Sequence, residues 1–283
     1  MIRRRLLSGV FLFAAILTLA GHVASAVEAK HIEGIEAYRQ SYILFDSYND
    51  HYNFNSIYGP ALGSQYLQQE VKFQISFQGL MYDFDAWGRK FEIGAAYTQQ
   101  AYWQLFNKPM SAPFRETNYE PELFVRWQDK QWMGQNTHFR FGYDHQSNGR
   151  SNPYSRSWNR LYGEVKLQDP DDDMWVGALR GWWRIPEKAG ADDNPGITEF
   201  YGFWQFDGRL ALDHEKKWKL HLMGRDNLRA KNKGAVQLDL SWKPDFFHDF
   251  SFYVQGFYGY GENLIAYNYV AARFGAGILL TNW

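Results

Sequence analysis

His145 and Ser147 are the two residues whose types and spacing most clearly permit covalent chemistry. They end a segment, 137–147, in which apolar and polar side chains alternate. On a β-strand, residues two positions apart project from one face, with Cα atoms about 7 Å apart, so the two side chains can turn towards each other. An imidazole that takes the proton of a serine hydroxyl makes an effective nucleophile from a weak one.

Asn159 can supply the third group that such a pair needs, one that holds the imidazole in the correct tautomer. It lies near the start of the next alternating segment, 158–167, and shares a face with Leu161. If the two segments pair as a hairpin, Asn159 lies at the same end as His145. Its neutral carbonyl can accept a hydrogen bond without adding a charge to an apolar face.

The elements that must position these residues are β-strands. Side chains alternate with period 2 along the chain, and no helical period of 3.6 dominates after residue 26. An even number of tilted strands of about ten residues, rich in aromatic residues, predicts an all-β fold, a twelve-stranded antiparallel β-barrel of the outer membrane. The predicted strands are 36–48, 70–80, 91–107, 118–127, 137–147, 158–167, 175–184, 198–213, 217–227, 234–243, 249–260 and 272–282.

The composition supports the barrel and excludes several other classes. Aromatic residues make up 19% of the 283 residues, and there is no cysteine, which argues against the alternative, a secreted β-sandwich. Only one stretch is apolar enough for a helical span, so a polytopic helical membrane protein is excluded. The net charge of −1 gives no reason to expect a nucleic-acid partner.

The first 26 residues have the pattern of a secretory signal peptide. Arg3, Arg4 and Arg5 precede the apolar run 6–20, and Ala24-Ser25-Ala26 supplies small residues for cleavage after Ala26. The run is too short for an uncleaved anchor helix, which needs about 20 residues. We therefore expect a signal peptide over 1–26, a periplasmic segment over 27–35 and the barrel over 36–283.

The barrel predicts where each side chain and each connection lies. With periplasmic termini, the connections 107–118, 148–157 and 185–197 lie outside the cell, and the acidic run 168–173 is a periplasmic turn, solvated rather than calcium-binding. The parity that turns the aromatic residues of 137–147 towards lipid also turns His145, Ser147 and Asn159 outwards. The same alternation points four charged residues into the barrel, namely Arg140, Asp144, Arg160 and Glu164.

Two interpretations of the outward polar residues compete at this point. Polar side chains on a lipid face are costly unless they serve one another or a substrate. Alternatively, they are ordinary rim residues in the headgroup layer, because an H-x-S pattern alone has little specificity. The connection 148–157, dense in oxygen donors and turn-forming residues, favours a functional site.

The same region resembles the outer-membrane phospholipase A family. The resemblance covers about 70–283 and is weaker over 27–69. The matching stretches are HQSNGRSNPYSRSWNRLY from His145 to Tyr162, PFRETNYEP from Pro113 to Pro121, YTQQAYWQL from Tyr97 to Leu105, DDNP from Asp192 to Pro195 and YGYGE from Tyr258 to Glu262.

The resemblance implies a phospholipid-hydrolysing enzyme with its active site on the outer wall of the barrel, near the external leaflet. It implies Ser147 as nucleophile, His145 as base and Asn159 as the orienting residue. It also implies Ca²⁺ in an active homodimer. Four residues match the family's calcium ligands: Ser111 from one subunit, Arg150 (main-chain carbonyl) and Ser155 from the other, and Asp193 at a further site in the monomer.

The sequence departs from the family pattern at four positions. Asn152 replaces an acidic residue near the calcium loop, which predicts weaker calcium binding. Gln146 replaces another acidic residue, but it points inwards and should have little effect. Ala112 stands beside Ser111 where a serine is usual, and Trp283 ends the chain where phenylalanine is usual.

Two other functions fit a barrel, namely a passive pore and a structural barrel without activity. Inward charged residues that pair across a narrow interior argue against an open channel. Ester hydrolysis by the protein and by a Ser147→Ala variant would separate an enzyme from an inactive barrel. The sequence gives neither the preferred position of ester cleavage nor the preferred headgroup.

Overall fold

The computed structural model describes residues 30–31, 34–129, 132–170, 173–188, 190–231 and 233–281. The predicted signal peptide over 1–26, part of the segment 27–35 and the terminal Trp283 lie outside these residues. Within the described part of the chain, no helix has the length and apolar character needed to cross a membrane.

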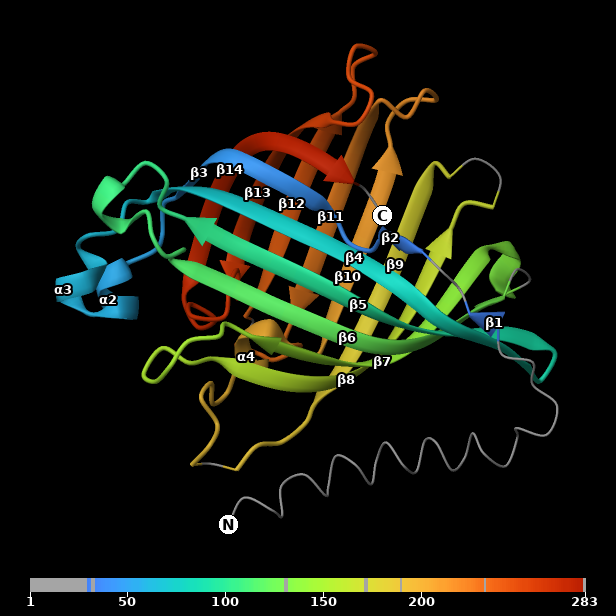
Figure 1. The fold of residues 1–283 in the computed structure, drawn as a ribbon, viewed down its shortest axis with the longest axis horizontal. Helices are drawn as coiled ribbons and strands as arrows, with labels where there is room; N and C mark the ends of the chain where they lie inside the picture. Colours follow the sequence, from blue (N-terminus) through green and yellow to red (C-terminus); the bar gives the residue numbers. More distant parts are fainter. Residues whose placement is uncertain are drawn as a thin grey trace.

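Twelve long strands form one closed antiparallel barrel, which confirms the predicted fold class (Figure 1). Successive strands pair along the chain, and pairing of the first long strand with the last closes the sheet. The strands are β3 (Ser41–Asn49), β4 (Gln69–Ala86), β5 (Arg89–Trp103), β6 (Glu116–Asp129), β7 (Asn136–Ser147), β8 (Ser157–Gln168), β9 (Trp175–Arg184), β10 (Trp204–Ala211), β11 (Trp218–Asp226), β12 (Gly234–Trp242), β13 (Ser251–Tyr260) and β14 (Val270–Thr281).

Two short strands, β1 (Lys30–His31) and β2 (Ile35–Ala37), continue the line of β3 along β4. Ile35 pairs with Gly79 and Lys30 with Asp83, whereas β3 pairs with the earlier part of β4. The residues before β3 therefore follow the long strand β4 towards its hairpin with β5.

The connections at one end of the barrel, which we call the loop end, carry most of the irregular structure (Figure 1). This end includes the connections 50–68, 104–115, 148–156 and 185–203. The helices are α2 (Phe54–Tyr58), α3 (Pro60–Gly63), the 3-10 helix η1 (Lys108–Met110) and α4 (Thr198–Tyr201); η2 (Trp132–Gly134) lies at the opposite end, between β6 and β7.

The strand predicted over 198–213 begins later than expected. Residues 198–201 form α4, and β10 starts at Trp204. Tyr201 is buried against Trp158, with ring centroids 5.1 Å apart, so its side chain belongs to an aromatic cluster at the loop end. Gly202 ends the helix with φ of 71°, a conformation that glycine adopts readily.

The outer wall is apolar, as the alternation predicts. Phe141, Leu161 and Leu179 on β7, β8 and β9 are exposed, and Trp127 stacks on Phe139 with ring centroids 5.0 Å apart. In a membrane barrel, such side chains meet the hydrocarbon layer, and aromatic residues concentrate near its boundaries. The wall that carries the candidate site is therefore a lipid-facing surface.

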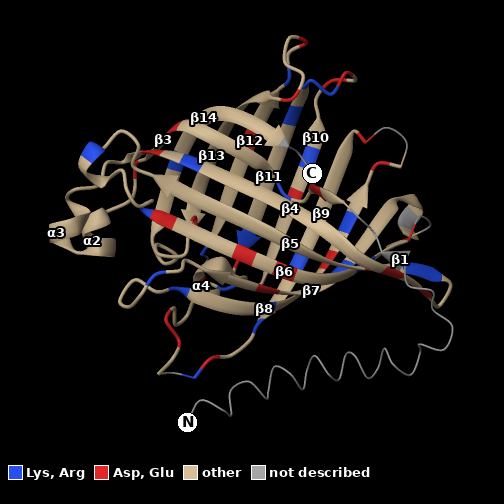
Figure 2. Ribbon diagram, viewed as in Figure 1, with Lys and Arg blue, Asp and Glu red and all other residues tan. Residues whose placement is uncertain are grey.

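Charged residues of both signs occur along the barrel strands as well as in the connections (Figure 2). Several of those on the strands are buried and form ion pairs with residues of nearby strands. Arg160 contacts Asp144 at 2.6 Å and Glu120 at 2.9 Å, and Arg180 contacts Glu164 at 2.7 Å. Asp144, Arg160 and Glu164 thus form ion pairs, as the sequence analysis expected, whereas Arg140 donates a hydrogen bond to Gln78. Hydrogen bonding and pairing are what make buried charges tolerable.

Glu70 is the centre of the most buried of these networks, and replacing it should destabilise the barrel. Its carboxylate lies 2.5 Å from Arg115 and 2.9 Å from Arg273, with all three side chains buried. Glu70→Ala leaves the buried Arg115 guanidinium without its carboxylate and leaves Arg273 with Glu262 alone, which should cost about 3–5 kcal/mol of unfolding free energy. Denaturant unfolding in detergent measures this cost.

The matched control is Asp245→Ala, which removes an exposed pair with Lys217 and should not change stability measurably. Equal stability of the two variants would contradict a structural role for the Glu70 network.

Candidate active site on the outer wall

The hairpin of β7 and β8 brings two of the three predicted catalytic residues together. The antiparallel register sets His145 directly opposite Asn159. The His145 Nδ1 atom lies 2.9 Å from the Asn159 Oδ1 atom. Since Oδ1 only accepts hydrogen bonds, this contact requires the proton of the neutral ring on Nδ1 and leaves Nε2 as the basic atom.

The third residue, Ser147, lies on the same strand face two positions beyond His145. It ends β7 and pairs with Ser157 on one side and with Tyr119 on the other. Among the described residues, no hydrogen bond joins Ser147 to His145. Catalytic hydrogen bonds are often long before substrate binds, so the shared face is the informative feature.

The burial of neighbouring residues shows which side chains of this hairpin point into the barrel and which point outwards. Asp144 and Trp158 are buried, whereas His145 and Asn159 are only half-buried. Gln146 accepts a hydrogen bond from the Trp158 indole N–H at 2.8 Å. The departure from the family at Gln146 therefore changes an interior contact and leaves the outward site intact.

Tyr143 is a contact of the site that sequence reasoning did not single out. Its hydroxyl donates to the Asn159 Oδ1 atom at 2.5 Å. The available signal was its position on the same face, two residues before His145. Asn159 thus accepts from both a phenol and an imidazole.

The connection 148–156 is anchored to the barrel through Asn148. Its Nδ2 atom donates to the Glu116 carboxylate at 3.2 Å and to the Tyr154 carbonyl at 2.9 Å. The Arg150 side chain also turns to Glu116, with Nε 3.2 Å from Oε2. The cationic guanidinium has no acceptor atom, so Arg150 can offer a metal ion only its main-chain carbonyl.

Two of the predicted calcium ligands are in direct contact. Ser155 Oγ donates to Asp193 Oδ2 at 2.7 Å, and the backbone N–H of Ser157 donates to Asp193 Oδ1 at 2.9 Å. The loop after β9 is thereby tied to the loop after β7. Asp193 therefore links two loops that are separated by two strands in the sequence.

Ser111 lies elsewhere at the loop end, just after η1. Its hydroxyl donates to the Lys108 carbonyl at 3.1 Å, and its own carbonyl accepts from the Trp103 indole at 2.8 Å. No hydrogen bond within the described residues connects Ser111 with Arg150 or Ser155. If the calcium ligands come from two subunits, Ser111 need not contact Arg150 or Ser155 of its own chain.

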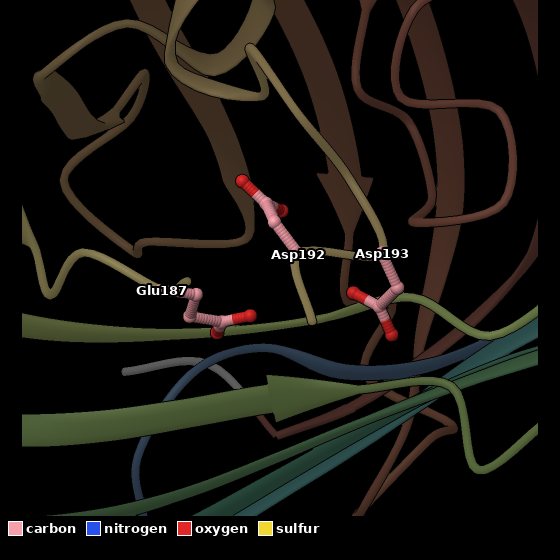
Figure 3. A group of neighbouring side chains, drawn as sticks. All are labelled: Glu187, Asp192 and Asp193. Carbon is pink, nitrogen blue, oxygen red and sulfur yellow. The ribbon is translucent and has the colours of Figure 1, made fainter. Parts of the chain in front are cut away.

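Glu187, Asp192 and Asp193 form an acidic cluster that the sequence analysis recognised only through Asp193 (Figure 3). One carboxylate oxygen from each lies within 4.8 Å of the others. Burial, together with the neighbouring Asp192 and Asp193, raises the pKa of Glu187 although Arg184 opposes the shift. Carboxylate and hydroxyl oxygens are the ligands that calcium prefers.

Comparisons with known proteins identify the family. Residues 23–280 match the family model described as Phospholipase A1. The chain is 36% identical to the phospholipase A1 of Proteus vulgaris over 258 residues, which cover 87% of this chain and 81% of that protein. The chain belongs to the phospholipase A1 family. The predicted resemblance is thereby confirmed.

Solved structures of outer membrane phospholipases share the fold of this family member. The calcium-bound dimer from Salmonella typhi has a TM-score of 0.78 and 33% identity, covering 88% of this chain and 93% of that one. The Escherichia coli outer membrane phospholipase A has a TM-score of 0.78 and 32% identity, covering 88% and 99%. An Escherichia coli active-site mutant with an asparagine replaced by alanine also has a TM-score of 0.78. The chain is thus an outer-membrane β-barrel of the phospholipase A1 family.

Proposed function

We propose that the protein hydrolyses phospholipid acyl esters in a calcium-dependent reaction at the outer wall of the barrel, with phospholipase A1/A2 and lysophospholipase activity. The observation that carries the proposal is the contact of 2.9 Å between His145 and Asn159, on the strand face that also carries Ser147. Family membership supports ester hydrolysis. The Escherichia coli mutant supports an asparagine as a member of the triad.

The geometry supports a defined division of roles. Asn159 Oδ1 holds the Nδ1–H of His145, so Nε2 takes the Ser147 proton as the hydroxyl attacks the ester carbonyl. His145 then gives that proton to the leaving alcohol, and water completes hydrolysis of the acyl-serine. Substrate arrives sideways from the membrane, so a deep pocket is unnecessary.

Calcium fits the oxygen donors around this site. Ser155 would contribute a hydroxyl and Arg150 its main-chain carbonyl, while Asp193, which accepts a hydrogen bond from Ser155, would contribute its carboxylate to a further site in the monomer. Ser111 of a second subunit would complete the set in a homodimer, in keeping with the Salmonella typhi relative, a dimer with bound calcium. When bound, calcium would stabilise negative charge on the oxygen of the attacked carbonyl.

The proposal places the site at the external leaflet. The loop end carries 148–156 and 185–203, which the periplasmic termini of such barrels would set outside the cell. A signal peptide over 1–26 and a periplasmic segment over 27–35 complete this arrangement.

Calcium-dependent release of fatty acid from phospholipid micelles tests the proposal directly. The competing function, a passive pore, predicts single-channel conductance and no fatty acid release. Ion pairs such as Arg160–Asp144 and Arg180–Glu164 in the interior argue against that pore. Absence of hydrolysis with and without calcium would refute the enzymatic proposal.

Asn159→Ala should lower hydrolysis without eliminating it. The variant removes the oxygen that holds His145 Nδ1–H, but it leaves the nucleophile and the base in place. The loss in kcat should not exceed about 10²- to 10⁴-fold, because a positioned general base contributes about that much and Asn159 only orients the base. Initial rates on phospholipid micelles provide the measurement. If Asn159→Ala lowered activity further in a Ser147→Ala background, its role would not be confined to the triad.

A further inference from the structure

The orientation of the Asn159 amide decides whether His145 is a competent base. The two ends of an amide have the same shape, but one accepts hydrogen bonds and the other donates. If the NH₂ group faced His145, the ring proton would move to Nε2, the atom that must accept the Ser147 proton. Something must therefore select one of the two orientations.

Tyr143 does not select the orientation by itself. Its hydroxyl lies 2.5 Å from Asn159 Oδ1. A hydroxyl both donates and accepts, so it could pair with either end of the amide. The neutral His145 ring can likewise adopt either tautomer.

Glu187 differs from Tyr143 and His145 because its carboxylate can pair with only one end of the Asn159 amide. Its Oε1 atom accepts from Asn159 Nδ2 at 3.5 Å, at the end of the amide opposite His145. An ionised carboxylate only accepts hydrogen bonds, so it is compatible with the NH₂ end alone. With Nδ2 held there, Oδ1 must face His145 and Tyr143.

Resting on the proposed function, we propose that Glu187 is a positioning residue for the reaction. It selects the Asn159 orientation that keeps the His145 proton on Nδ1 and leaves Nε2 free to act as base. No hydrogen bond within the described part of the chain joins Glu187 to Ser147 or His145, so it acts through Asn159.

The local fold explains how a loop residue reaches the triad. The ladder between β8 and β9 continues one step beyond Arg184, where the backbone N–H of Ile185 donates to the Asn159 carbonyl at 2.8 Å. This bond fixes the start of the loop next to Asn159, and Glu187 follows two residues later. The side chain is half-buried, so its orientation is restricted.

The other two acids of the cluster have different partners. Asp192 pairs with Arg184 at 2.7 Å, and Asp193 accepts from Ser155 at 2.7 Å. The three carboxylates thus have three different partners, namely Arg184 for Asp192, Ser155 for Asp193 and Asn159 for Glu187. Glu187 is the member that contacts Asn159.

Kinetics of Glu187→Ala and Glu187→Gln on phospholipid micelles test the inference. The contact is long, so we expect Glu187→Ala to lower kcat about threefold to tenfold, with KM changed less than about twofold. Glu187→Gln should lose less, because its carbonyl oxygen can still accept from Asn159 Nδ2. The control Glu199→Gln removes an acid of α4 that pairs with Lys233, and it should leave the rate unchanged.

A double-mutant cycle with Asn159→Ala separates positioning from a merely structural role. If Glu187 acts through Asn159, then Glu187→Ala has no further effect once Asn159 is alanine. The same loss of rate in both backgrounds would overturn the inference. So would equal losses in Glu187→Ala and Glu187→Gln.

Two further measurements separate this inference from the proposed function. Hydrolysis by the unmodified protein, and its loss in Ser147→Ala, test the proposed function without involving Glu187. The calcium concentration for half-maximal activity should be the same in Glu187→Ala and the unmodified protein. A large increase in that concentration would identify Glu187 as a metal ligand and overturn the positioning role.

Discussion

Replacing Ser147 by alanine is expected to abolish phospholipid hydrolysis while the barrel remains folded. Ser147 lies on the same strand and the same outward face as His145, two residues further along the strand. It ends β7 and is half-buried, so the missing oxygen leaves little unfilled space. Release of fatty acid measures activity, and circular dichroism in detergent measures the fold.

His145→Ala should cause a comparable loss, and the two losses should not add. A nucleophile without its base and a base without its nucleophile are equally ineffective, because the residues act as one unit. In a serine protease with a catalytic triad, removal of either the serine or the histidine costs about 10⁶-fold in kcat. Ser251→Ala, a serine at the start of β13, is the matched control and should hydrolyse normally. Near-normal turnover in either Ser147→Ala or His145→Ala would refute the assignment.

The barrel fold and the outward orientation of His145, Ser147 and Asn159 were predictable because side chains alternate between the two faces of a strand. A period of 2 fixes which side chains face lipid, and the antiparallel hairpin of β7 and β8 fixes which residues are opposite. The pairing of His145 with Asn159 follows from these two constraints. The inward pairing of Arg160 with Asp144 follows in the same way.

The loop contacts were not predictable, because connections have no such period. The sequence gives no rule that would bring Glu187 to Asn159 or Tyr154 to the segment before β4. In the structure, the Tyr154 hydroxyl donates to the Tyr58 carbonyl at 2.9 Å, which joins the connection after β7 to α2. Likewise, α4 replaces the start of an expected strand, because Tyr201 packs against Trp158.

Removal of calcium should abolish most activity and shift the protein from dimer to monomer. In the proposed arrangement, Arg150 and Ser155 of one subunit and Ser111 of the other supply the ligands. All three residues lie in connections of the loop end, so two barrels side by side would bring them to one level of the membrane. By linkage, calcium must favour the dimer as strongly as the dimer favours calcium.

Ser155→Ala tests this linkage in a single residue. The variant removes one ligand and the hydrogen bond from Ser155 Oγ to Asp193, while the barrel strands stay intact. Calcium affinity should fall by about tenfold or more, as it does when partners of a metal site are lost. The fraction of dimer should fall with it. Analytical ultracentrifugation in detergent, with calcium and then with chelator, measures the dimer.

The matched control is Ser151→Ala, an exposed serine of the same connection whose carbonyl accepts from the Tyr154 backbone N–H. That bond involves only the main chain, so the control should keep the dimer and its calcium dependence. If Ser155→Ala weakened calcium binding but not dimer formation, the two would not be linked through this residue. Full activity of a strictly monomeric species in chelator would exclude a shared calcium site, because both the ion and the ligand from the second subunit would be missing.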